Sequence, residues 1–218
     1  MKKYFLLILC LMPLCLLAQT YKMYQTRNYH NQLRLNTATG EVLQVQDDGQ
    51  SWKICDAREE SGKVDNRFCL YETQNMWTFL MLDTFTGKNW QVQFSTEGTD
   101  YMFATPINYW SKAFPSSSSD KWVGRFQMFA TQNMWTFIML DSYTGRLWQV
   151  QYDTKSLDNL LCVSINEEVL ESGDRSIFSI QPMTSMFQYY LISNKSGAMW
   201  QFQWTTEGPD YRWIKRVN

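Results

Sequence analysis

The chain has 218 residues, of which 44% are hydrophobic and 16% aromatic, with 20 basic and 21 acidic side chains. This near-neutral balance argues against a surface built to bind nucleic acid or anionic membranes. Lys2 and Lys3 precede an apolar stretch over residues 4–18 that has the order of a secretory signal and is too short to span a bilayer. We therefore expect residues 1–19 to be a signal peptide. The mature chain, of net charge 18 − 21 = −3, would be periplasmic, on the cell surface or secreted, with no membrane span.

A unit of about 50 residues recurs four times in this sequence. The segment that begins at Thr73 recurs 58 residues later (131 − 73 = 58), and 16 of the 23 positions aligned between residues 71–93 and 129–151 are identical. Looser copies end at residues 40–46 and 197–203. A fixed period of this kind predicts one repeat domain over residues 20–218. The repeats cover about 20–60, 61–113, 120–168 and 172–218, with a Pro- and Ser-rich exposed loop at 114–120.

Each repeat contains four strand candidates in succession. The first lies at residues 67–72 in the second repeat. In the next, residues 77–82, apolar side chains occupy both faces, which indicates an interior strand. Asp83 and Gly87 then mark a short hairpin loop, and a strand follows in which Trp90 and Val92 alternate with glutamines. With a fourth strand after each hairpin, the pattern predicts an all-β protein of about 16 strands, four antiparallel ones per repeat.

The hairpin Leu82-Asp83…Thr86-Gly87…Trp90 resembles the hairpins of quinoprotein-type β-propellers and, more distantly, the Asp-box of sialidase propellers. The resemblance covers about 15 residues in each repeat. It implies an architecture rather than an active site: a small, four-bladed β-propeller-like ring in the manner of the hemopexin fold.

Asn75 and Trp77, with Asn133 and Trp135 in the third repeat and Asn28 in the first, open the interior strands. One interpretation places these amides and rings around one mouth of the ring, where a sugar could stack and form hydrogen bonds. The other interpretation, which we favour, is that Asn caps a tight turn and Trp belongs to the core.

Glutamines occupy two matched positions in every repeat, and Gln91 and Gln149 are the first of each pair in the middle repeats. If the next repeat covers them, their amides must form internal hydrogen bonds, since a lost partner costs about 1–3 kcal/mol. If they are open, they form a polar surface suited to a polysaccharide. We favour the internal role, and we keep Gln91 and Gln149 as candidate ligand-binding residues beside the asparagines and tryptophans.

His30 stands where the other repeats have an aromatic residue, so we expect it to replace a packed ring rather than to act as a base. No metal or cofactor is expected, because no dinucleotide, phosphate-loop or metal-ligand motif is found. Cys55 and Cys69 flank the junction of the first two repeats. They could form a disulfide or remain buried thiols.

The preferred hypothesis is an exported, non-enzymatic repeat protein that binds a glycan or an envelope protein through a polar and aromatic face. One alternative is a propeller-type glycosidase that uses Glu97, Asp100, Glu207 or Asp210. It would need two carboxyl groups about 5 Å or about 7–9 Å apart in one pocket. The other alternative is a structural component of the envelope that docks through exposed strand edges.

Overall fold

The computed structural model describes residues 20–57, 63–107, 122–171 and 177–217. The predicted signal peptide and the loop at 114–120 lie outside these residues. Within them the protein is all-β, and its helical segments are short 3-10 turns, η1 (Thr99–Tyr101), η3 (Leu157–Asn159) and η4 (Pro209–Tyr211). No helix in the described ranges is long and apolar enough to cross a bilayer.

Sixteen strands form four antiparallel sheets, each built from four strands that are consecutive in the chain. The first sheet contains β1 (Tyr21–Gln25), β2 (Asn31–Asn36), β3 (Glu41–Gln46) and β4 (Ser51–Asp56). The second contains β5 (Phe68–Glu72), β6 (Thr78–Asp83), β7 (Asn89–Gln93) and β8 (Phe103–Pro106). The third contains β9 (Phe126–Ala130), β10 (Thr136–Asp141), β11 (Leu147–Gln151) and β12 (Leu161–Asn166). The fourth contains β13 (Phe178–Pro182), β14 (Gln188–Ser193), β15 (Met199–Gln203) and β16 (Trp213–Arg216).

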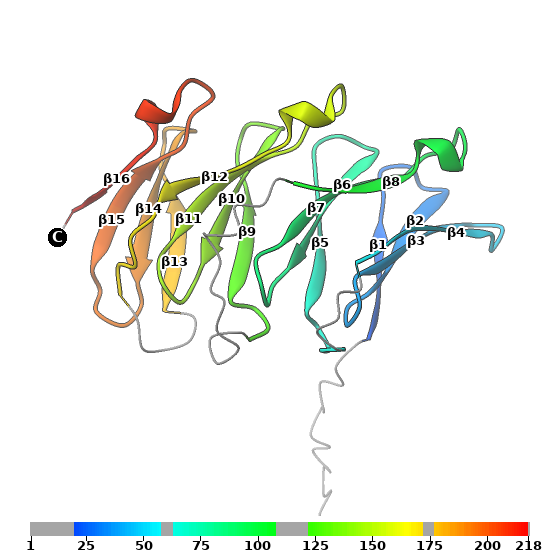
Figure 1. The fold of residues 1–218 in the computed structure, drawn as a ribbon, viewed down its shortest axis with the longest axis horizontal. Helices are drawn as coiled ribbons and strands as arrows, with labels where there is room; N and C mark the ends of the chain where they lie inside the picture. The colour runs from blue at the N-terminus through cyan, green and yellow to red at the C-terminus, as the bar shows by residue number, and fades with distance from the viewer. Residues whose placement is uncertain (1–19, 58–62, 108–121, 172–176, 218) are drawn as a thin grey trace, which may run out of the picture.

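The sheets stand side by side in chain order along the longest axis of the molecule, and each falls within one predicted repeat (Figure 1). The predicted all-β, four-repeat, propeller-like architecture is confirmed. The first and fourth sheets lie at opposite ends of the row, so the described residues form an open array of propeller-like blades (Figure 1).

Three apolar cores hold the array together, one between each pair of neighbouring sheets. Leu33 and Leu35 of β2 pack with Phe79 and Met81 of β6 in the first core. The alternate residues of β6 face the other way and pack on the third sheet, so every residue of β6 is buried. The corresponding strand β10 is buried throughout for the same reason, which confirms that the second strand of a middle repeat is interior. A third core joins the third and fourth sheets.

The hairpin turns explain the recurrent Asp and Gly. The carboxylate of Asp83 accepts a hydrogen bond from the backbone N–H of Phe85 at 3.0 Å, and Gly87 has a φ of 84°. Gly145, with a φ of 74°, has a second constraint, because a Cβ there would lie 2.9 Å from the ring of Phe178 in the next sheet. A turn residue that permits positive φ therefore also permits close packing of the sheets.

Cys55 lies on β4 of the first sheet and Cys69 on β5 of the second, and both are free thiols. Cys55 packs in the core between the first and second sheets, and Cys69 packs in the core between the second and third. The disulfide considered from the sequence is thus not formed. Of the two alternatives, the structure shows free thiols, and both are partly buried.

Candidate functional site

A compact turn joins the first two strands of each sheet, and its hydrogen bonds explain the recurring Thr-x-Asn. The Thr73 hydroxyl donates to the carbonyl of Thr78 at 2.7 Å. The side-chain oxygen of Asn75 accepts from the backbone N–H of Trp77 at 2.9 Å and from the hydroxyl of Thr78 at 3.2 Å. The amide oxygen of Asn75 is therefore committed to the turn, in line with the capping interpretation.

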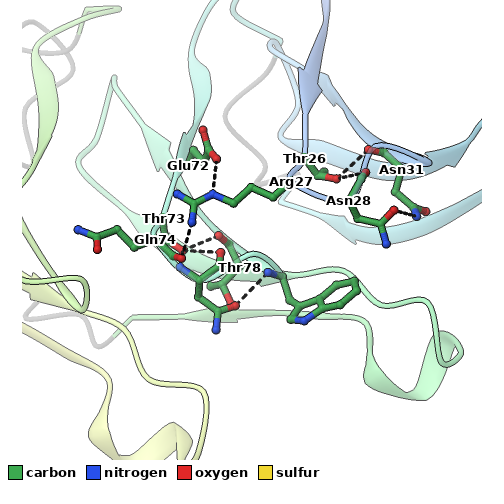
Figure 2. Close-up of polar contacts among 10 residues, drawn as sticks. Thr26, Arg27, Asn28, Asn31, Glu72, Thr73, Gln74 and Thr78 are labelled. Carbon is green, nitrogen blue, oxygen red and sulfur yellow. Dashed lines mark hydrogen bonds and ion pairs between the residues drawn. The ribbon is translucent and has the colours of Figure 1, made fainter.

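The same turn recurs in the first and third sheets. Asn133 accepts from the backbone N–H of Trp135 at 2.9 Å, and Asn28 accepts from the backbone N–H of His30 at 3.1 Å. Figure 2 shows the turn of the first sheet beside that of the second. Arg27 reaches across to the carboxylate of Glu72 at 3.1 Å and to the carbonyl of Gln74 at 2.7 Å.

Trp77 and Trp135 are partly buried and each packs on an aromatic residue of its own sheet. The ring centroids of Trp77 and Phe94 are 5.3 Å apart, and those of Trp135 and Tyr152 are 5.2 Å apart. In the first sheet the equivalent residues are His30 and Asp47, which form an exposed hydrogen bond at 2.9 Å between the Nδ1 atom of His30 and the Asp47 carboxylate. His30 thus occupies an aromatic position, but it is exposed and stacks against Tyr29 rather than filling a core.

Gln91 and Gln149 are buried and clamp the neighbouring sheet. The Gln91 side chain donates to the carbonyl of Asp153 at 2.9 Å and accepts from the N–H of the same residue at 3.2 Å. Gln149 forms the same pair of bonds with Thr205, at 2.8 and 3.3 Å. Gln44 of the first sheet does so with Ser95, at 2.9 and 3.1 Å. We call this contact the glutamine clamp. It matches the internal role favoured for these glutamines, and it commits both polar ends of each amide.

A surface groove of about 310 Å³ lies at the corner of the second sheet where the turn of Asn75 meets the loop after β7. Three aromatic residues line it. Phe94 is buried, whereas Trp77 is partly buried and Tyr101 is 56% exposed, so Trp77 and Tyr101 present ring surface to the groove. The third sheet adds Thr154, which directly follows the clamped residue Asp153. The polar lining consists of Asn75, Gln93, Ser95, Thr96, Glu97 and Thr154.

This groove brings together two of the predicted binding residues, Asn75 and Trp77. Gln91 and Gln149 lie in the interfaces between sheets, while Asn133 lines a separate recess of about 110 Å³ between the corners of the second and third sheets. Asn28 and Trp135 belong to the corresponding turns of their own sheets. No single mouth gathers all of these side chains among the described residues.

Hydroxyl, amide and carboxylate groups beside two aromatic rings can bind a polyhydroxylated ligand, with the rings against its apolar face. Glu97 is the one carboxylate that lines the groove in the described part of the chain. Beside the groove, the backbone N–H of Lys155 donates to the carboxylate of Asp153 and holds the pKa of Asp153 below its usual value. The described residues contain no cluster of three or more His, Cys, Asp or Glu that could hold a metal ion.

Tyr101 is the aromatic groove residue with an exposed ring that sequence reasoning missed. The sequence carries a signal for it, because the segment Glu97-Gly98-Thr99-Asp100-Tyr101 resembles the fourth-repeat segment that ends in Tyr211. Both tyrosines are exposed, at 56% and 54%, and each is the last residue of a short 3-10 turn. An aromatic residue that recurs on the surface is a signal for binding that strand periodicity does not contain.

No protein-family model matches this chain, and no curated protein matches it. Solved structures resemble it in fold. A candidate 6-phosphogluconolactonase from Bacteroides uniformis is 6% identical with a TM-score of 0.49, over 90% of this chain and 54% of that one. An auxiliary nutrient binding protein from Bacteroides thetaiotaomicron is 10% identical with a TM-score of 0.44, over 89% and 46%. A β-propeller domain from Myceliophteria thermophila is 12% identical with a TM-score of 0.29, over 89% and 70%. The chain spans about half the length of the first two.

Proposed function

We propose that this protein is an exported, non-enzymatic binding protein that takes a short glycan in the groove of Trp77 and Tyr101. The observation that carries the proposal is the composition of the groove, in which two aromatic rings stand among amide, hydroxyl and carboxylate groups. Its volume of about 310 Å³ lies at the lower end of the range for small-molecule sites. Such a groove suits one or two sugar rings rather than a long chain.

The clamp of Gln91 supports this assignment because it places one wall of the groove. Thr154 belongs to the third sheet, while Asn75, Trp77 and Tyr101 belong to the second. Since both polar ends of Gln91 bond to Asp153, the loop that carries Thr154 is held against the second sheet before a ligand arrives. A pre-formed wall lowers the ordering cost of binding.

The glycosidase alternative has less support in this groove. A hydrolytic site needs two carboxyl groups about 5 Å or about 7–9 Å apart, and Glu97 is the one that lines the groove among the described residues. Glu207 and Asp210 belong to the loop of the fourth sheet, so they would serve a different corner. We therefore propose binding without hydrolysis, and analysis of bound glycan for cleavage products tests that part.

The chain supplies a matched pair of variants to test the site. Tyr101→Ala removes one aromatic wall of the groove, whereas Tyr211→Ala makes the same change at an equally exposed position in the fourth sheet. After a glycan-array screen, titration calorimetry should show affinity reduced by about tenfold or more in Tyr101→Ala, a loss of about 1.4 kcal/mol. Tyr211→Ala should bind as the unchanged protein does. Equal affinities for all three proteins would contradict the assignment. Binding of envelope proteins without binding of glycans would favour the protein-ligand alternative.

A further inference from the structure

Two backbone contacts recur at every junction between neighbouring sheets. One is the glutamine clamp, which Gln44, Gln91 and Gln149 make to the next sheet. In the other, the first strand of a sheet donates a backbone N–H to the preceding hairpin. Phe68 donates to Thr37 at 2.8 Å, Phe126 to Thr84 at 3.0 Å, and Phe178 to Ser142 at 2.9 Å. The junction is therefore a repeated docking unit with two sides. The donor side is the face that carries the clamp glutamine, and the receiving side is the face of the next sheet that carries the clamped loop and the first strand.

The fourth sheet has the donor side of this unit without a following sheet. Gln201 occupies the clamp position, because its pairing with Tyr190 repeats that of Gln91 with Leu80. Its amide bonds instead to the side chain of Gln188, at 3.1 Å, on the same face. Tyr190, Ile192, Met199 and Trp213 lie on this face, are partly exposed and belong to none of the three cores.

The first sheet has the receiving side without a preceding sheet. Tyr21 and Met23 are 51% and 45% exposed, although Phe68 and Leu70, their counterparts in register, are 3% and 6% exposed. The residue that a clamp would hold is Asp48. Its neighbour Asp47 donates its backbone N–H to His30, in the way that Phe94, before the clamped Ser95, donates to Trp77. Both apolar strand positions and the clamp-receiving loop are thus in place.

The charges on the two faces permit contact. On the first sheet, Lys53 lies 3.1 Å from Asp56 and 3.9 Å from Glu41, and Arg34 lies 3.8 Å from Glu41, so this cluster is neutral. On the fourth sheet, Lys215 lies over the ring of Trp213. Across existing junctions, the last strands of neighbouring sheets contact each other, as β4 does with β8 and β12 with β16. By the same geometry, β16 of one copy would contact β4 of the next. Lys215 would then lie near the paired charges of the first sheet without net repulsion.

We propose that the fourth sheet of one copy docks on the first sheet of a second copy, and the reverse, so that two chains close an eight-sheet ring. The occupant is a second copy because its first sheet has the receiving register of the internal junctions. Two fourth sheets placed face to face would present two clamps and no receiving loop. Such head-to-tail contacts close when the rotation fits and otherwise extend into filaments. This inference does not depend on the glycan proposal.

The test is the mass of the purified protein in solution, measured by light scattering after size exclusion. The unchanged chain should have the mass of two copies. Met23→Glu blocks the receiving face and Tyr190→Glu blocks the donor face, so each variant alone should be monomeric. A mixture of the two should form dimers again, because the intact Tyr190 face of one can dock on the intact Met23 face of the other.

Several results would overturn the proposal. These are a monomeric unchanged chain, a single variant that remains dimeric, a mixture that stays monomeric, or assemblies larger than two chains. If either glutamate variant fails to fold by circular dichroism, a cysteine experiment replaces it. Gln201→Cys mixed with Asp48→Cys should form disulfide-linked heterodimers under mild oxidation, whereas Gln46→Cys mixed with Asp48→Cys should not. Equal yields from both mixtures would also overturn the proposal.

Discussion

The two middle sheets and the two end sheets use the same positions for different chemistry. In the second sheet, Arg67 and Asp83 form a buried ion pair at 2.6 and 2.9 Å, and Arg125 and Asp141 do the same in the third. By register, the first sheet has Thr20 and Asn36 at these positions, and the fourth has Ile177 and Ser193. The Ser193 hydroxyl of the fourth sheet donates a hydrogen bond to the carboxylate of Glu171 at 2.7 Å.

The aromatic pairs at the opposite edge of the sheets change in the first sheet alone. Trp77 and Phe94 are in contact in the second sheet, and Phe187 and Trp204 keep this contact in the fourth, with ring centroids 4.9 Å apart. In the first sheet the two positions hold His30 and Asp47, which form a hydrogen bond instead. A sheet covered on both faces can bury a bidentate Arg–Asp pair. The array excludes water from the pair, and each charged group provides the hydrogen-bond partners of the other. The comparison teaches that the position of a repeat in the row, and not the hairpin alone, decides its buried polar groups.

The largest expected effect comes from breaking a buried ion pair. Asp83→Ala leaves the guanidinium of Arg67 buried without its carboxylate, and we expect a loss of about 3–5 kcal/mol in the free energy of unfolding. Urea unfolding followed by tryptophan fluorescence measures it. The double variant Arg67→Ile with Asp83→Ser copies the fourth sheet and should recover much of the loss. A double variant as unstable as Asp83→Ala would show that the charges do not account for the difference between middle and end sheets.

The glutamine clamp should have the next largest effect. Gln91→Ala leaves the N–H and carbonyl of Asp153 without their side-chain partner in a buried junction, at a cost of about 1–3 kcal/mol. Gln46→Ala is the matched control, because Gln46 is the second glutamine of the first sheet, whose clamp residue is Gln44. It should change stability by less than about 0.5 kcal/mol. Equal losses in the two variants would remove the distinction between the clamp glutamine and the second glutamine of a repeat.

Alkaline pH should weaken the junctions that contain tyrosine hydroxyls. Burial raises the pKa of Tyr24 and of Tyr71 above the ordinary value of 10.0, and each hydroxyl accepts a backbone N–H of the next sheet. The unfolded chain therefore loses these protons first, so stability is fully present below about pH 10 and falls as pH rises further. The fourth sheet has Gln181 at this position. Unfolding of Tyr71→Phe should show a smaller decline between pH 9 and pH 11, about the range in which tyrosine titrates. An unchanged slope would contradict this origin.

The smallest effect is kinetic and concerns the thiols. Burial raises the pKa of Cys55 and of Cys162 to about 12, so little thiolate is present at neutral pH. Both thiols face internal junctions rather than the open faces, and we expect a colorimetric thiol reagent at about pH 8 to react slowly with the folded protein and rapidly in urea. Rapid reaction in the folded state would show that these junctions open readily.

The hairpins could be predicted from the sequence because their signals are local. The strand period, the Asp of each turn and the positive φ of glycines such as Gly87 and Gly145 all act within a few residues. The pairing of Arg67 with Asp83 could not be predicted in this way, because it joins two strands across a register that only the folded sheet fixes. The groove was only half predictable. Asn75 and Trp77 stand out by repetition, but Thr154 reaches them from another sheet.

The clamp bonds only to the main chain of the residue it holds, and this has a consequence for how such a protein can change over time. Ser95, Asp153 and Thr205 all fill the same role, so the receiving side chain is free to vary while the junction persists. A duplicated blade inherits a working connection on both sides without any compensating change. The number of blades can therefore grow or shrink by whole units, and surface loops such as the one that carries Tyr101 can diverge independently toward new ligands.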